Sequence, residues 1–322
     1  MKVTTLLAGD RRALAKAITL VESTRADHRI EADALLDKLL PHIGRSLRIG
    51  ISGVPGVGKS TFIEALGLML IWQGHRVAVL AVDPSSSVSG GSILGDKTRM
   101  ERLSVNDKAF IRPSPTSGAL GGVAEHTREA LLLCEAAGFD IVIVETVGVG
   151  QSETAVAGMT DLFVLLQLPN AGDDLQAIKR GVMELADVVA INKADLDDAA
   201  AMRAMAQITS ALRIFGFHGR GEHRAAPVVK LSALKGEGLD AFWQTLQGEV
   251  QCRRDNGEFD ARRSAQREAW LWDIVQARLL HDFKHDAAVR EALPAALADV
   301  NASRAAPPVA ARALLNLFEK NG

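Results

Sequence analysis

The sequence predicts an α/β fold in which a mostly parallel β-sheet is flanked by helices, with helical extensions at both ends. Apolar runs of five to eight residues alternate with helix-length stretches through the middle of the chain. This pattern is typical of parallel strands that are buried on both faces. At 322 residues and 48% hydrophobic content, the chain is long and apolar enough for one large domain with appendages or for two domains.

An N-terminal helical extension is expected over residues 1–46. Apolar residues recur there at helical spacing, as at Leu14, Ile18 and Val21. Asp10 stands just before this segment, where its carboxylate can cap the first turn of a helix.

The sheet is expected within residues 47–248. Its predicted strands are Leu47–Ser52, Val77–Asp83, Asp140–Glu145, Asp161–Leu168, Val188–Asn192 and Val228–Leu231. The predicted helices between them are Ser60–Gln73, Gly122–Ala137, Leu175–Leu185 and Ala199–Phe215. Regular alternation of strands and helices indicates parallel strands joined by crossover helices.

A C-terminal helical extension is expected over residues 249–322. Residues 261–286 form an amphipathic pattern whose apolar stripe contains Trp272, Val275, Leu279 and Phe283. The segment has too little domain around it to bury that stripe, which favours association between subunits. Pro294 is expected to break the helical stretch that follows.

Composition and charge exclude several classes of protein. The 37 basic and 39 acidic residues nearly balance, and the arginine pairs near residues 253 and 262 are interleaved with acids, so no nucleic-acid partner is expected. Cys134 and Cys252 cannot form a disulfide framework. Because apolar runs such as Leu66–Trp72 are too short for a bilayer and the N-terminus is charged, we expect a cytoplasmic protein with no membrane association.

The strongest motif is a phosphate-binding loop directly after the first predicted strand. It reads Gly53, Val54, Pro55, Gly56, Val57, Gly58, Lys59, Ser60 and Thr61, which satisfies G-x-x-x-x-G-K-[ST]. Its glycines let successive backbone N–H groups face a polyphosphate, and the following helix N-terminus adds partial positive charge. Lys59 can reach the β- and γ-phosphates, and the Ser60 hydroxyl can ligate Mg²⁺.

A second motif predicts guanine as the base. Asn192, Lys193, Ala194 and Asp195 form N-K-x-D at a strand end. The Asp195 carboxylate can accept from both N1–H and the 2-amino group of guanine, whereas adenine would leave it unpaired. Downstream, Leu231, Ser232 and Ala233 are expected to supply backbone N–H groups for guanine O6.

Two acidic residues follow predicted strands and are expected to serve the metal. Asp83 and Glu145 stand at the carboxyl ends of parallel strands, where such folds hold ligands. Both are therefore placed to hold Mg²⁺ directly or through its waters. The segment from Glu145 to Gly148 resembles the D-x-x-G loop of GTPases, with Gly148 donating its N–H to the γ-phosphate. Gln151 then becomes a candidate for positioning the attacking water, the alternative being an ordinary surface glutamine.

Together these motifs resemble the MeaB/ArgK family of GTPases, from about residue 9 to the C-terminal helices. The resemblance also covers two further segments, Asp83–Ser86 and Gly91–Met100. It implies a homodimeric P-loop GTPase of the SIMIBI class that chaperones an adenosylcobalamin-dependent methylmalonyl-CoA mutase. GTP binding and hydrolysis would gate cofactor loading and protect or reactivate the mutase. By position Asp83, Asp96 and Glu145 match the Mg²⁺-site acids, and the loop Gln167–Lys179 matches a switch that responds to the partner, with Gln176 and Lys179 as candidates for steadying transition-state charge.

The expected reaction is hydrolysis of GTP to GDP and phosphate, in line at Mg²⁺. Such catalysis is mostly positioning and charge neutralisation, so no tightly bound cofactor is expected besides Mg²⁺ with the nucleotide. Lys59 and the loop backbone would cover the phosphate oxygens, while Glu145 and Asp96 would organise the metal and its water shell.

Three other functions stay open from the motifs alone. One is a kinase or ATPase that acts on a lysine/arginine/ornithine transport-binding protein, which N-K-A-D and the missing targeting segment oppose. Another is a metallochaperone GTPase for nickel enzymes, although the chain has no C-x-x-C and its eight histidines are scattered. The third is a nucleotide-binding module without hydrolysis, which the intact Lys59, Ser60 and Glu145 oppose.

Overall fold

The structure is a computed structural model, and it describes residues 2–82, 100–113, 120–146, 152–169, 180–214 and 225–319. The chain divides into two compact units, Met1–Gln266 and Arg267–Gly322. Within the described ranges, every helix is too short or too polar to span a bilayer.

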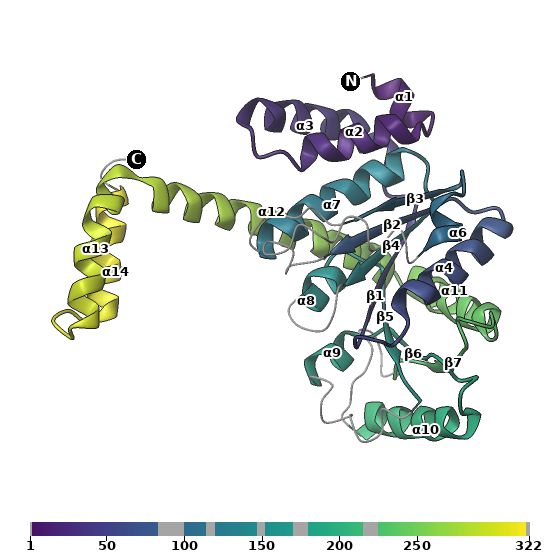
Figure 1. Cartoon of the computed structure of the whole chain (residues 1–322). Coiled ribbons are helices and arrows are strands. Elements are labelled where there is room, and N and C mark those ends of the chain that lie inside the picture. The colour runs from purple at the N-terminus through teal and green to yellow at the C-terminus, as the bar shows by residue number, and fades with distance from the viewer. Residues whose placement is uncertain are drawn as a thin grey trace. The chain divides into compact units, whose positions relative to one another are not determined.

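The first unit is built on a seven-stranded sheet in which every paired strand is parallel to its neighbour (Figure 1). The strand order is β3-β2-β4-β1-β5-β6-β7. The strands are β1 (Leu47–Gly53), β2 (Val77–Val82), β3 (Ala109–Arg112), β4 (Ile141–Thr146), β5 (Leu162–Gln167), β6 (Val188–Ile191) and β7 (Val228–Lys230). The predicted α/β class with a parallel sheet is confirmed, and β3 is a strand that the sequence pattern did not reveal.

Helices cover both faces of this sheet and form two separate cores. Alternation along β4 illustrates the division, because Ile141 and Ile143 belong to one core and Val142 and Val144 to the other. One face packs against α4 (Lys59–Trp72), α6 (Glu101–Ser104) and α11 (Leu239–Asp255). The opposite face packs against α7 (Leu120–Ala136), α8 (Ser152–Ala157), α9 (Arg180–Leu185) and α10 (Asp198–Ile214).

The N-terminal helices add a further layer over α7 (Figure 1). They are α1 (Val3–Leu7), α2 (Arg11–Val21), α3 (Ala26–Leu39) and the short 3₁₀ turn Leu40–His42. The predicted cap is confirmed, because the Asp10 carboxylate accepts a 2.7 Å hydrogen bond from the Ala13 N–H. A 2.6 Å ion pair between Arg29 of α3 and the buried Glu129 of α7 ties the layers together.

The C-terminal helices are α12 (Glu258–His285), α13 (Ala287–Asn301) and α14 (Pro307–Glu319). The boundary between the two units falls within α12. Pro294 lies inside α13, so the predicted helix break at this residue is wrong. Proline removes one N–H donor, but the neighbouring residues keep helical geometry and α13 packs along α14. Pro307 instead begins α14, where a missing N–H costs nothing.

Candidate nucleotide site

A glycine-rich turn at the carboxyl end of β1 leads directly into α4. Gly56 and Gly58 adopt φ values of +81° and +92°, a left-handed region that residues with a side chain rarely occupy. Gly58 is also confined sterically, since a Cβ at this residue would lie 2.8 Å from Nδ2 of Asn192. The glycines therefore serve both the sharp turn and the close approach of a second loop.

The first turn of α4 carries polar groups suited to an anion. It begins with Lys59, Ser60 and Thr61 and contains no acidic residue. The ammonium of Lys59 lies over the turn and donates a 2.7 Å hydrogen bond to the carbonyl oxygen of Gly53. Together with the N–H groups at the start of a helix and the partial positive charge there, this arrangement can bind a polyphosphate.

Asn192 connects the glycine-rich turn to the two loops expected to hold the base. Its buried amide donates to the carbonyl oxygen of Val57 at 2.8 Å and accepts from the N–H of Ala233 at 3.0 Å. Three segments that are distant in sequence thus meet at one side chain. The geometry brings together the phosphate loop and both predicted base loops at the carboxyl edge of the sheet.

The two base loops are also held by their backbones. The N–H of Ala194 donates to the carbonyl oxygen of Leu231 at 3.1 Å, and Ser232 exchanges two backbone hydrogen bonds with Glu237. Lys193 has a positive φ of 62°, and its ammonium donates to the carbonyl oxygen of Gly56 at 2.8 Å. Asp195 is half-buried beside these loops.

Glu145 is buried at the carboxyl end of β4. It pairs in register with Ile51 of β1 and Ala81 of β2, and alternation places it on the face of the sheet that α4 covers. In the described part of the chain, no three His, Cys, Asp or Glu residues form a metal-binding group. The carboxylate of Glu145 and the hydroxyl of Ser60 are nevertheless oxygen donors of the kind that Mg²⁺ prefers.

Several predicted site residues lie outside the described residues. They are Asp83, Asp96, Gly148, Gln151 and Lys179, together with Gln176. The described members of the predicted site are Gly53–Thr61, Glu145, Asn192, Lys193, Asp195 and Leu231–Ala233.

Comparison with known proteins decides the family. The family model described as "Methylmalonyl Co-A mutase-associated GTPase MeaB" matches residues 14–288. The chain belongs to the MeaB family. A protein of Caulobacter vibrioides named as a GTPase is 57% identical over 289 residues, covering 90% of this chain and 88% of the relative. The mouse protein named methylmalonic aciduria type A homolog, mitochondrial, is 48% identical over 98% of this chain and 78% of its own length.

A solved structure agrees with this membership in the MeaB family. The crystal structure described as a LAO/AO transport system kinase has a TM-score of 0.80 and 36% identity, covering 98% of this chain and 96% of that chain. With the GTPase names of its relatives and its P-loop fold, this MeaB-family protein is a GTP hydrolase.

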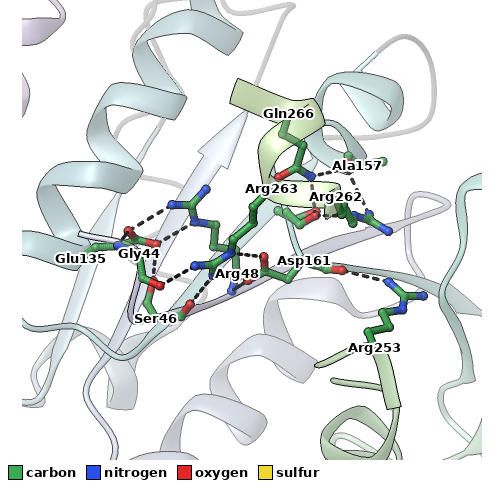
Figure 2. A network of polar contacts seen from close by, with 11 residues as sticks. Gly44, Ser46, Arg48, Glu135, Ala157, Asp161, Arg253, Arg262, Arg263 and Gln266 are labelled. Atoms are coloured by element: carbon green, nitrogen blue, oxygen red, sulfur yellow. Dashed lines mark hydrogen bonds and ion pairs between the residues drawn. The ribbon is translucent and has the colours of Figure 1, made fainter. Parts of the chain in front are cut away.

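The sequence did not reveal a buried ionic network at the amino ends of the strands, opposite the end of the sheet that carries the nucleotide site (Figure 2). Arg48 of β1 pairs with Glu135 of α7, with Nε 2.7 Å from Oε1. Ser46 and the Gly44 N–H also donate to this carboxylate. Burial raises the pKa of Glu135, but these donors and the Arg48 charge outweigh it, so the pKa lies below its ordinary value.

Arginines from α11 and α12 complete the network. Arg253 and Arg262 contact Asp187, which precedes β6, and Arg263 contacts Asp161, which precedes β5. Arg262 and Gln266 also donate to the carbonyl oxygen of Ala157, the last residue of α8 (Figure 2). Both side chains donate to the carbonyl oxygen of Thr160 as well. The sequence pattern indicates only a mixed charged surface for these arginines, because their buried partners are brought to them by the tertiary fold.

Proposed function

We propose that this GTPase chaperones an adenosylcobalamin-dependent methylmalonyl-CoA mutase, using GTP hydrolysis to gate cofactor loading and to protect or reactivate the mutase. The observation that carries the proposal is the match of residues 14–288 to a family described as mutase-associated. The name of the mouse relative, which refers to methylmalonic aciduria, supports the same metabolic context.

In the proposed site, the backbone from Gly53 to Gly58 and the start of α4 bind the phosphates. Lys59 exchanges its hydrogen bond to the Gly53 carbonyl for the β- and γ-phosphate oxygens. The Asp195 carboxylate accepts from N1–H and the 2-amino group of guanine. Asn192 holds the base loops against the phosphate loop through its hydrogen bonds to Val57 and Ala233.

Mg²⁺ fits the oxygen donors that the structure describes. Ser60 and Glu145 would hold it, together with Asp83 and Asp96 from outside the described residues. When bound, the ion would neutralise charge on the phosphate oxygens. The chain itself would position GTP and the attacking water, a role for which Gln151 and Lys179 remain candidates.

The C-terminal helices support a homodimer. Large apolar side chains on α12 are strongly exposed in the single chain, among them Leu271, Trp272, Leu279 and Leu280, each more than half exposed. Exposed apolar surface of this kind is typical of an interface between proteins. We place the contact between two copies on these helices, as the sequence pattern predicts.

The proposal is tested by capturing partners from a cobalamin-using bacterium and measuring GTP hydrolysis with and without the captured protein. We expect a cobalamin-dependent acyl-CoA mutase to be captured and to accelerate hydrolysis, because docking of the partner would complete the charge stabilisation around the phosphates. Unchanged hydrolysis in the presence of the mutase would contradict the chaperone role. Transfer of phosphate to a transport-binding protein would favour the kinase alternative instead.

A further inference from the structure

The side-chain amide of Gln167 is buried without a hydrogen-bond partner. Its residue is only 1% exposed, and among the described residues neither Nε2 nor Oε1 has a partner. An unsatisfied amide inside a protein costs free energy. A buried group of this kind therefore requires an explanation, and its place in the fold provides one.

Gln167 ends β5 between the phosphate loop and the base loop. On one side, Leu166 pairs in register with Gly53 of β1, and a Cβ on Gly53 would lie only 2.7 Å from the Leu166 carbonyl oxygen. On the other side, the Asn192 N–H donates a 2.8 Å hydrogen bond to the Gln167 carbonyl oxygen. The last two residues of β5 thus contact both halves of the candidate nucleotide site, Leu166 on the phosphate-loop side and Gln167 on the base-loop side.

The Gln167 side chain itself does not face α4. Alternation along β5 places it with Phe163 and Leu165, in the core that α8 and α9 cover. The amide therefore acts through the end of β5 and does not contact the phosphates. A change at Gly53 would reach the amide through the backbone of the adjacent Leu166. Such a change is expected because Lys59 holds the Gly53 carbonyl and bound phosphates attract the same ammonium.

We propose that Gln167 is a positioning residue whose amide becomes hydrogen-bonded when GTP binds at the glycine-rich turn. In the nucleotide-free protein the amide is buried without a hydrogen bond, which raises the free energy of this form relative to the GTP-bound form. The inference rests on the proposed function in one respect, namely that GTP occupies this turn.

The test compares Gln167→Met with the wild-type protein and with Leu165→Met as a matched control. Both substitutions place a flexible apolar side chain on the same face of β5 with little change of volume. Melting temperatures are measured with and without a non-hydrolysable GTP analogue and Mg²⁺, and the affinity for the analogue is measured by calorimetry. We expect Q167M to raise the melting temperature of the nucleotide-free protein and to weaken binding of the analogue about tenfold, whereas L165M leaves the affinity unchanged.

Wild-type affinity in Q167M would overturn the inference, as would an equal rise in melting temperature with and without the analogue. A lower melting temperature of nucleotide-free Q167M would also overturn it, because the amide would then be stabilising that form. If the wild-type protein fails to bind the analogue, both this inference and the proposed GTP site are wrong. If the wild type binds and Q167M binds equally well, only the inference is wrong.

Discussion

Arg263 and Asp161 form a doubly hydrogen-bonded ion pair inside the protein. Nε and Nη2 of the guanidinium lie 2.7 Å from the two different carboxylate oxygens. Asp161 also accepts a 2.8 Å hydrogen bond from the Arg48 N–H, and Arg263 donates to the carbonyl oxygen of Ser46. The start of α12 is thereby bonded to the amino ends of β1 and β5.

Replacement of Arg263 by methionine is expected to destabilise the protein by about 3–5 kcal/mol, because it leaves the Asp161 carboxylate buried without its countercharge. The measurement is urea-induced unfolding monitored by circular dichroism. Arg278→Ala is the control, since Arg278 pairs with Asp282 on the exposed surface of α12 and should cost less than about 1 kcal/mol. Similar small effects of both substitutions would contradict the importance of the buried pair.

Glu135→Gln is expected to make stability less dependent on acidic pH. The pKa of Glu135 lies below its ordinary value of 4.5 in the folded protein, so the unfolded chain takes up this proton first as the pH falls. The carboxylate therefore stabilises the fold fully above pH 4.5, and the contribution is lost as the pH falls toward the lowered pKa. The melting-temperature gap between wild type and E135Q should be widest near neutral pH and narrow below 4.5. Exposed Glu101→Gln should show no such gap.

Gly58→Ala is expected to weaken nucleotide binding by at least about tenfold, because the new Cβ would collide with the Asn192 amide, 2.8 Å away. Gly74→Ala is a matched control: Gly74 also has a positive φ of 104°, but a Cβ at this residue would meet no heavy atom within 4 Å. Both variants carry backbone strain, but only Gly58 lies in the glycine-rich turn, and only its new Cβ would meet the Asn192 amide. Equal nucleotide affinities in a calorimetric titration would show that Asn192 is not held by this close approach.

Lys59→Ala is expected to lower the rate of GTP hydrolysis by about 100-fold or more, since one preorganised positive charge on the phosphates is removed. The folded structure should persist, because Lys59 is only partly buried and its ammonium bonds to the carbonyl oxygen of Gly53 at the edge of the sheet. Phosphate release is the measurement, with Lys38→Ala on the remote helix α3 as the control. Hydrolysis at the wild-type rate in K59A would reject the proposed phosphate site.

Asp195→Asn is expected to weaken GTP binding about 10- to 100-fold, because a charged acceptor for two guanine donors is lost. Binding of ATP should change little, since adenine offers no such pair of donors. Competition between the two nucleotides for the wild-type and variant proteins measures the preference. An unchanged ratio would reject the assignment of Asp195 to the base.

The sheet could be predicted from the sequence because β1, β2, β4, β5 and β6 are short, largely apolar runs that are mostly buried. β3 was not predicted because its apolar run is only Ala109–Ile111, set between Lys108 and Arg112, with one β-branched residue, whereas β7 at the other edge has two adjacent valines. The helix containing Pro294 shows the opposite error, in which a local signal was overridden by the packing of α13 against α14.

Those parts of the candidate site that lie within one short stretch of sequence could be predicted. The glycine-rich turn and N-K-x-D are contiguous motifs, so their residue types alone indicate their roles. The bridging by Asn192 could not be predicted, because it joins segments 135 and 41 residues away. The buried state of Gln167 and Arg263 likewise depends on neighbours that only the folded chain brings together.

The arginines of α11 and α12 have a practical consequence for anyone who wishes to shorten this polypeptide. A chain cut at Gly248, where the strand pattern ends, would lack the guanidinium groups that face Asp161 and Asp187. Those carboxylates would then lose the ion pairs that compensate for their burial in the folded chain. A chain that runs through Gln266 keeps every one of these countercharges, so truncation experiments on the enzyme should begin there.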